Sequence, residues 1–219
     1  MSEADNAIDR DDRRWRPAGS GRSFVYVLPC SGEAILKIGF SRDPLNRFQT
    51  LHPRYFEYFD LDAAWLVETD SVREARSIER SLGTQVKAHA AVQPMSIRHQ
   101  AGGRTEWYRG AETVLTGAAD ALSKQGMLLH RPLRPWLAST LEARSGLLFH
   151  WSAQMLDAIG GDVDADLRAY SNALDPAASR LHWTLRNALD AYAAFNLPRR
   201  ESVPAAVAGW YARHEARTR

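Results

Sequence analysis

The sequence predicts an α+β fold, in which a small three-stranded antiparallel sheet is flanked by helices and followed by an all-α C-terminal domain. Two observations support this prediction. Short apolar runs of strand length occur among helical segments up to about residue 125, and only helical patterns occur after Gly126. We therefore expect a disordered or loosely attached tail at residues 1–21, an α+β domain at 22–125 and a helical domain of unknown role at 131–219.

The predicted strands are rich in β-branched, aromatic and aliphatic residues. The first, SFVYVLP at residues 23–29, ends at a proline, and the second, AILKIGF at residues 34–40, follows after the turn CSGE. Their closeness along the chain predicts a β-hairpin with a somewhat long loop. The third, FDLDAAWLV at residues 59–67, shows partial alternation of apolar and polar side chains.

The predicted helices are recognised by apolar residues at helical spacing. In the first helix, Asp43 is a good N-cap and Pro44 occupies the first helical position, and His52-Pro53 ends the helix. Two further helices of the α+β domain are expected at about 71–89 and 111–124. In the C-terminal domain the expected helices are residues 135–159, 162–174, 177–196 and 203–216.

Charge and cysteine content narrow the class of protein. The net charge is 28 − 26 = +2, which argues against a strongly cationic protein that coats nucleic acid but leaves room for a local basic patch. The single cysteine, Cys30, cannot form an internal disulfide, so we expect a reducing, cytoplasmic compartment. No secretory signal and no apolar run of roughly 18 residues occurs, so we expect no membrane association.

Four short motifs follow one another between residues 23 and 110. The tripeptides Phe24-Val25-Tyr26 and Lys37-Ile38-Gly39 lie on the two strands of the predicted hairpin, and Arg47 follows in the next helix. The segments ARSIERSL, which contains Glu79, and GRTEWY come later. In type, order and spacing these motifs resemble the GIY-YIG nuclease superfamily, specifically its lysine-containing viral and bacterial branch, the T5orf172-like proteins.

The resemblance implies a metal-dependent endonuclease that hydrolyses phosphodiester bonds in nucleic acid, most of all double-stranded DNA. In such a site Tyr26 would act as the general base or help to form it, and Lys37 would tune it or hold phosphate. Arg47 would stabilise charge on the phosphate, and Glu79 would bind Mg²⁺ or Mn²⁺. Lys37 stands where the wider family has tyrosine, which leaves open which of its two roles applies.

The residues themselves also single out Glu79. In the predicted helix at 71–89 it lies in line with Ala75, Leu82 and Val86, so a carboxylate interrupts an otherwise apolar stripe. Burying such a charge costs free energy unless the group is paired or bound to metal. An ion pair with Arg47 or Arg76 is the structural alternative to a metal, and Glu74 is a less favoured ligand.

Other residues are weaker candidates, each with a structural alternative. His52 could carry a proton after the arginine helix, or simply cap that helix. Glu106 stands where many relatives of the family have asparagine, so it either orients a neighbour or is structural. The candidates for contact with substrate are Gly39, Arg42, Arg54, Arg104 and Glu106.

Two further functions stay open on the sequence. The first is a catalytically degenerate GIY-YIG fold that binds nucleic acid or protein without cutting. The second is a nuclease toxin or defence effector whose helical domain binds a protein partner. Residues 131–219 contain four tryptophans, typical of a packed core, and their expected role is to position DNA, to self-associate or to bind another protein.

Overall fold

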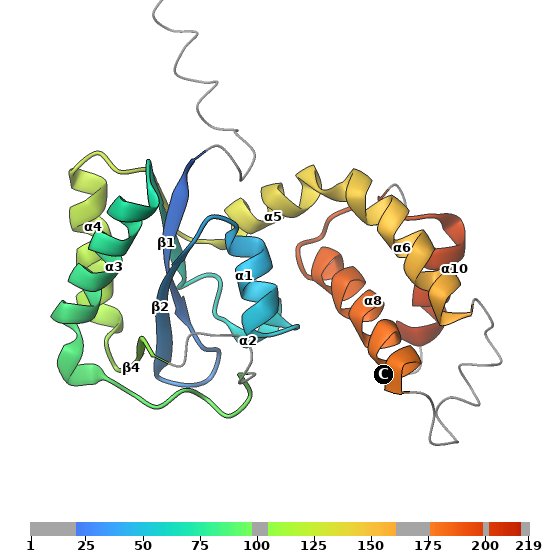
Figure 1. Ribbon diagram of the computed structural model, residues 1–219, viewed down its shortest axis with the longest axis horizontal. Coiled ribbons are helices and arrows are strands. Elements are labelled where there is room, and N and C mark those ends of the chain that lie inside the picture. Colours follow the sequence, from blue (N-terminus) through green and yellow to red (C-terminus); the bar gives the residue numbers. More distant parts are fainter. Residues whose placement is uncertain (1–20, 98–104, 161–175, 199–201, 216–219) are drawn as a thin grey trace, which may run out of the picture.

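The computed structural model describes residues 21–97, 105–160, 176–198 and 202–215, and these form a layered α/β part with a group of helices beside it (Figure 1). The tail before Gly21, Arg104 and the helix expected at 162–174 lie outside the described residues. No helix among the described residues is long and apolar enough to span a membrane.

The sheet has five strands in the order β4-β2-β1-β3-β5, and all neighbouring strands are antiparallel. The strands are β1 (Ser23–Pro29), β2 (Ile35–Ser41), β3 (Trp65–Thr69), β4 (Trp107–Arg109) and β5 (Leu129–His130). The α+β class is confirmed, and the prediction of three strands is wrong. Strands β4 and β5 contain three and two residues, too few for the alternation that identifies a strand in a sequence.

Helices cover both faces of the sheet (Figure 1). One face carries α1 (Pro44–Leu51) and α2 (Tyr55–Tyr58); the other carries α3 (Val72–Gln85) and α4 (Glu112–Lys124), with a short 3₁₀ helix at Lys87–His89. Helix α1 begins as predicted, because the Asp43 carboxylate accepts a hydrogen bond from the amide of Asn46 at 3.1 Å.

Strand alternation assigns side chains to these two faces. In β1, Tyr26 belongs to the core on the α1 face, whereas Val25 and Val27 belong to the core on the α3 face. In β2, Leu36 and Ile38 face α3. The alternate positions of β2, Lys37 and Gly39, therefore lie on the α1 face with Tyr26.

The third strand is shorter than predicted and begins later. Instead of continuing from Phe59, the chain turns at Asp60, whose carboxylate accepts hydrogen bonds from the amides of Asp62 and Ala63 at 3.1 Å. An Asp side chain that binds amides two and three residues ahead favours a turn over a strand. The strand itself, β3, begins at Trp65.

The C-terminal region is helical, as predicted, but the expected helix at 135–159 is two helices. The helices are α5 (Arg134–Ala143), α6 (Ser145–Ile159), α8 (Pro176–Ala194) and α10 (Ala205–Glu215). The break is at Arg144, whose backbone leaves the helical region at φ −94°, ψ 6° and whose guanidinium donates to the Asp43 carboxylate at 2.9 Å. This contact joins the break to the N-cap of α1.

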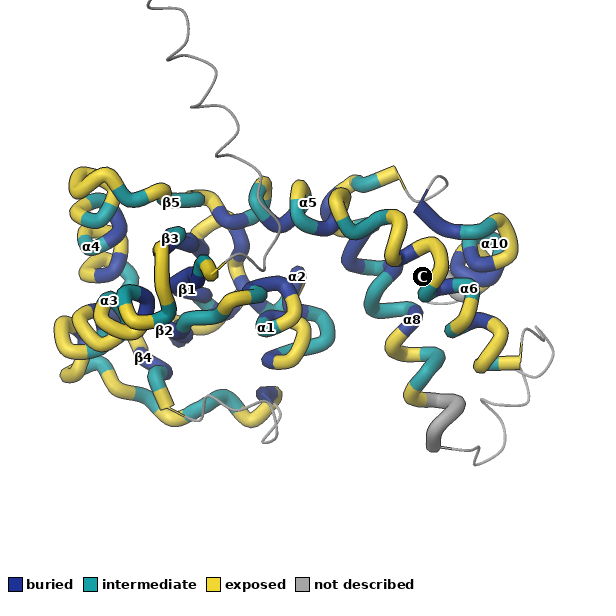
Figure 2. Tube along the Cα trace, turned by 45° about the horizontal axis from the view of Figure 1, so that its top comes forward, coloured by how far each residue is buried: buried dark blue, intermediate teal, exposed yellow. Residues whose placement is uncertain are grey.

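The helical region and the α1 face of the sheet share one continuous apolar core. Buried side chains extend from Phe24 and Tyr26 through α1 to Leu137, Leu189 and Trp210. Buried stretches, dark blue in Figure 2, recur along α5, α8 and α10 on the right of the molecule. The domain boundary at residues 125–131 stays a prediction, because the core does not divide there.

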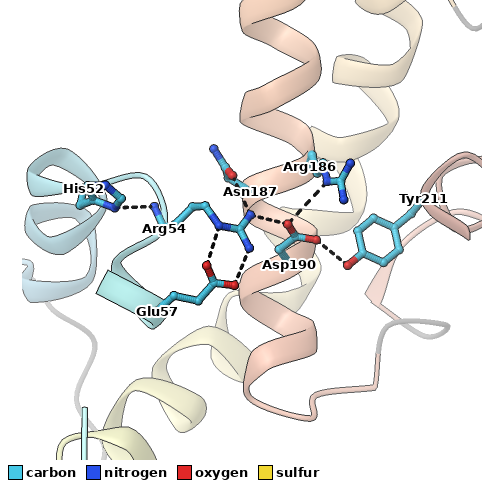
Figure 3. A network of polar contacts seen from close by, with 7 residues as sticks. All are labelled: His52, Arg54, Glu57, Arg186, Asn187, Asp190 and Tyr211. Atoms are coloured by element: carbon cyan, nitrogen blue, oxygen red, sulfur yellow. Dashed lines mark hydrogen bonds and ion pairs between the residues drawn. The ribbon is translucent and has the colours of Figure 1, made fainter. Parts of the chain in front are cut away.

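A polar network joins α2 to α8 within this contact (Figure 3). Arg54, just before α2, donates to the Asp190 carboxylate at 2.6 Å and to the Asn187 side-chain oxygen at 3.3 Å, and it also pairs with Glu57. Asp190 additionally accepts from the Tyr211 hydroxyl of α10. Three elements of the helical contact are thereby fixed around one carboxylate.

Candidate active site

Tyr26 lies on β1, the central strand of the sheet, and is only 1% exposed. Directly across from it on β2 is Gly39, where an added Cβ would lie 2.4 Å from the tyrosine hydroxyl oxygen. The ring also meets Phe48 of α1 edge-on, with ring centroids 5.0 Å apart. Gly39 is thus required by the close approach of the tyrosine, which gives the glycine of the second motif a structural reason.

Lys37 is buried on the same face, with 1% of its surface exposed. Its Nζ donates to the carbonyl of Thr105 at 2.8 Å and to Oε2 of Glu106 at 3.0 Å. Burial lowers the pKa of this ammonium group, and the hydrogen bond to Glu106 opposes the change. The cation is therefore held in place by groups from the segment before β4.

The conformation and contacts of Glu106 position its carboxylate to pair with Lys37. Its backbone has φ 61°, a left-handed conformation that is uncommon outside glycine, and Thr105 Oγ1 donates to its second carboxylate oxygen at 2.6 Å. Burial would raise the pKa of Glu106, but the hydrogen bonds from Thr105 and Lys37 outweigh burial and lower it. Glu106 is therefore the counter-ion of Lys37.

Arg47 approaches from α1, the helix that covers this face. Its Nε donates to the hydroxyl of Tyr26 at 3.4 Å. Burial raises the pKa of Tyr26, while the guanidinium of Arg47 acts in the opposite direction. The buried tyrosine thus keeps its proton more strongly than a free one, and Arg47 is the group that favours the phenolate.

Glu79 comes from α3, on the other side of the sheet, and is half-buried next to Ala75 and Leu82, which are fully enclosed. No hydrogen bond or ion pair links its carboxylate to a residue in the described part of the chain, so the expected alternative of an ion pair with Arg47 or Arg76 is not present there. Burial and the charge of Glu106 raise the pKa of Glu79. Within the described residues, its carboxylate therefore has no partner of the kind that such burial calls for.

Glu74, the less favoured ligand, has a different task. Its carboxylate accepts a hydrogen bond from the amide of Asp70 at 2.9 Å, while Ser71 caps the amide of Glu74. This reciprocal arrangement is a capping box that starts α3.

These groups form one electrostatic cluster. The charges of Arg47, Glu79 and Glu106 all influence the pKa of Tyr26 and of Lys37. One cation, Arg47, and two carboxylates, Glu79 and Glu106, therefore act on the buried hydroxyl of Tyr26, and the same three charges act on Lys37. The four main predicted catalytic residues are thus linked electrostatically, together with Glu106.

The weaker candidates lie in other surroundings. The ring of His52 stacks on Tyr58 with centroids 4.2 Å apart, and its Nδ1 accepts from the amide of Arg54 at 3.2 Å. Both residues line an open pocket with Ser31 and Glu57. Arg54 is already engaged by two carboxylates, and Arg42 is exposed just after β2. Their contacts with substrate stay predictions.

Among the described residues, no group of three or more His, Cys, Asp and Glu side chains is arranged to hold a metal ion. The cluster does offer Glu79, a carboxylate with no partner among the residues that the structure describes, whereas Glu106 is bound by Lys37. Magnesium is commonly held by one or two carboxylates and completes its shell with water and phosphate oxygens. Glu79 fits that manner of binding.

The comparisons with known proteins concern the part of the chain that contains this cluster. Residues 23–123 match the family model of the T5orf172 domain, from the start of β1 to the end of α4. Over these residues, a little under half of its length, the chain is similar to the T5orf172 family. The domain is associated with nuclease-type proteins of the GIY-YIG kind, so the resemblance seen in the motifs is confirmed. No significant match was found among curated proteins or among solved structures.

Within the matched residues, the two partners of Lys37, which are Thr105 and Glu106, were not assigned from the sequence. The Thr105 carbonyl that binds Lys37 is a backbone group and has no sequence signal. The pairing of Glu106 with Lys37 could have been anticipated, because a lysine in the middle of an apolar strand needs a counter-ion.

Proposed function

We propose that the chain is a metal-dependent endonuclease that hydrolyses phosphodiester bonds in nucleic acid, most of all DNA. The T5orf172 domain supports a nuclease-like or DNA-binding function at the coarser level. The observation that supports the finer proposal is Glu79, a half-buried carboxylate with no partner among the described residues, whose charge acts on Tyr26 and Lys37.

In the proposed reaction, water attacks the phosphorus atom, the bond to the leaving oxygen breaks, and the proton of the water passes to a base. Tyr26 accepts that proton as the phenolate, the form that Arg47 favours against the effect of burial. Arg47 also stabilises charge on the phosphate. A Mg²⁺ or Mn²⁺ ion bound by Glu79 would supply positive charge to the non-bridging oxygens.

Lys37 has a supporting part in this proposal. Because it is enclosed and hydrogen-bonded to Thr105 and Glu106, its proposed role is to tune the site through its charge, which lowers the pKa of Glu79 and of Glu106. Direct contact with the phosphate would require Lys37 to give up the bond to Glu106. The structure thus favours the tuning role over the phosphate-binding role that the sequence left open.

Plasmid cleavage tests the proposal. Purified wild type, Glu79→Gln and Glu74→Gln are incubated with supercoiled DNA in Mg²⁺, Mn²⁺ or EDTA, and folding is checked by circular dichroism. We expect metal-dependent nicking by wild type and Glu74→Gln, and a loss of about 100-fold or more in Glu79→Gln. Cleavage by Glu79→Gln at the wild-type rate would contradict the metal assignment.

A second function is favoured by one observation. Both Tyr26 and Lys37 are 1% exposed, as expected for a fold that has kept its core but binds nucleic acid without cutting it. Folded wild type that binds DNA in a salt-dependent way, yet cuts neither DNA nor RNA with any divalent ion, would support this binding module over the nuclease. A toxin or defence effector with a partner-binding helical domain stays a prediction, and co-purification of such a partner is its test.

A further inference from the structure

Helix α3 carries a row of basic side chains next to Glu79. Arg73, Arg76 and Arg80 are all exposed and follow a spacing of three and four residues, so they lie along one side of the helix. At 100° per residue, this side adjoins the edge where Glu79 lies, and the buried positions Ala75 and Leu82 face the sheet. The row is thus the solvent flank of the candidate active site.

These arginines have no carboxylate partner among the described residues, in common with Arg180 and Arg213. No ion pair or hydrogen bond joins the side chains of Arg73, Arg76 or Arg80 to another described residue. Ion pairs do occupy many of the remaining arginines: Arg22 with Glu68, Arg54 with Glu57 and Asp190, Arg131 with Asp120, Arg134 with Asp62, and Arg144 with Asp43. With three arginines and two glutamates, α3 has a net charge of 3 − 2 = +1, and its arginines make no ion pair in the described part of the chain.

One contact fixes where the row lies. The guanidinium of Arg76 is placed over the ring of Phe40, near the end of β2, with 5.6 Å to the ring centroid. Gly39, next to Phe40, is the residue opposite Tyr26. Arg76 therefore lies near the end of β2, on the α3 face of the sheet, and the charges of Arg76 and Arg80 also lower the pKa of Glu79 against the larger effect of burial.

We propose that Arg73, Arg76 and Arg80 bind successive phosphates of a DNA duplex and deliver the strand to Glu79 and Arg47. The proposal rests on the proposed function and adds the surface that holds the substrate. Seven residues of helix span about 10 Å, and the phosphates of one strand of a duplex advance about 3.4 Å each along the axis. The row therefore covers about three phosphates, one for each arginine.

The test measures binding in EDTA, so that it does not depend on cleavage. A fluorescein-labelled DNA duplex of about 30 base pairs, long enough to cover the domain, is titrated with the full chain, and anisotropy is recorded between low and moderate salt. The variants are Arg73→Gln/Arg80→Gln and, as a charge-matched control, Arg180→Gln/Arg213→Gln. The control arginines are exposed on α8 and α10 and make no ion pair in the described part of the chain.

We expect the double variant on α3 to lose about tenfold in affinity and the slope of log K against log salt to fall by about 1.8, the loss of two phosphate contacts. The control should keep the wild-type affinity and slope. Equal losses in both variants, or none in the α3 variant, would overturn the proposal. So would wild type that binds no DNA duplex, or that binds only the RNA duplex of the same sequence.

Failure of this inference and failure of the proposed function give different results. If the wild type binds DNA through α3 but does not cut it, the proposed nuclease function is wrong and the proposed role of Arg73, Arg76 and Arg80 stands. If the wild type cuts DNA and the α3 variant binds DNA as well as the wild type does, the nuclease function stands and the proposed role of the arginines is wrong. Arg76→Gln is studied separately, because Arg76 also packs on Phe40 and its loss changes more than charge.

Discussion

At the scale of single residues, the candidate active site depends on atoms that almost touch. Gly39 and Tyr26 are paired across β1 and β2, and the space that a methyl group would need at Gly39 is already filled by the tyrosine ring. We expect Gly39→Ala to lower the free energy of unfolding by about 1–3 kcal/mol, because the ring must move inside a packed core. Urea denaturation measures this change.

The matched control for that substitution is Gly117→Ala. Gly117 lies in α4, and nothing stands within 4 Å of the position its Cβ would take. The same added methyl group should there leave stability unchanged or raise it by about 0.5–1 kcal/mol, the helix propensity of alanine over glycine. If both substitutions had the same effect, the close contact with Tyr26 would not be what demands the glycine.

The pair formed by Lys37 and Glu106 leads to an asymmetric prediction. Lys37→Met removes a buried charge and leaves Glu106, whose side chain is 38% exposed, to water, so stability should change by less than about 1 kcal/mol. Glu106→Ala leaves the ammonium enclosed without its counter-ion and should cost about 2 kcal/mol. The double variant should be more stable than Glu106→Ala alone. Chemical denaturation of the three proteins gives these differences.

Lys37→Met also has a pH signature. Burial lowers the pKa of Lys37 in the folded protein, so in alkaline solution the unfolded chain binds more protons there than the folded one. The wild type should therefore gain stability relative to Lys37→Met as the pH rises from the folded pKa towards about 10.4, the ordinary lysine value. A constant difference between the two proteins across that range would mean that the lysine titrates as it does in the unfolded chain.

At the scale of elements, helix α3 has a capped N-terminus and an apolar face, and the charge of Glu79 beside that face lowers the stability of the fold. Burial and Glu106 raise the pKa of Glu79, so the folded protein binds more protons at this site than the unfolded chain. The wild type should lose stability relative to Glu79→Gln as the pH rises from about 4.3 through the folded pKa. Thermal unfolding at pH 4 and pH 7 checks the sign: Glu79→Gln should be more stable than wild type at pH 7.

Addition of Mn²⁺ should reverse the order of stability of wild type and Glu79→Gln in thermal unfolding at pH 7. Mn²⁺ that binds the folded wild type stabilises it by mass action, by about 2.7 kcal/mol when the ion is at 100 times its dissociation constant. Glu79→Gln should show no such rise in Tm, and Glu74→Gln should respond as wild type does. A similar rise in all three proteins would show that Mn²⁺ binds elsewhere.

Elements also show what could be predicted from sequence and what could not. The hairpin, α1 and α3 were predictable because local signals agree: Asp43 and Pro44 start α1, and a regular stripe defines the buried face of α3. Strands β4 and β5 were not, because their few residues are extended only through pairing with β2 and β3. The third strand was predicted to begin too early, at residue 59, because apolar and polar side chains also alternate in the turn formed by Asp60.

The candidate site divides along the same line. Tyr26, Lys37, Arg47 and Glu79 were recognised from the order of the motifs, which reflects local spacing. The partners that set their chemistry were not, because the contact between Lys37 and Thr105 spans 68 residues and involves a backbone carbonyl. The sequence thus names the candidate reacting groups, whereas the fold decides which of their charges is neutralised.

At the scale of the whole molecule, the helical region is attached to the α+β part by the apolar core and by the network around Asp190. This carboxylate is 12% exposed and serves Arg54, Arg186 and Tyr211. We expect Asp190→Ala to lower the free energy of unfolding by about 1–3 kcal/mol, because its partners lose an acceptor in a partly buried place. Urea denaturation is again the measurement.

Asp62→Ala is the matched control, because Asp62 also pairs with an arginine across elements. Its ion pair with Arg134 has good geometry, at 2.8 Å, but the Asp62 side chain is 63% exposed. The loss should be below about 1 kcal/mol, as for other exposed ion pairs. Equal losses in the two variants would indicate that the network at Asp190 does not hold the helical region in place.

The distribution of the cluster along the chain has a consequence for how the site assembles. Tyr26, Lys37 and Arg47 all belong to the hairpin and the helix that follows it, whereas Glu79 and Glu106 arrive with elements that dock later in the sequence. The local half of the site carries both cations, and the distant half brings both carboxylates. Contacts between neighbours in the sequence form with less loss of chain entropy than distant ones. A partly folded chain would therefore present the two cations, which can bind an anion, before the carboxylates that would hold a metal are in place. Destabilised variants should then bind nucleic acid without cutting it.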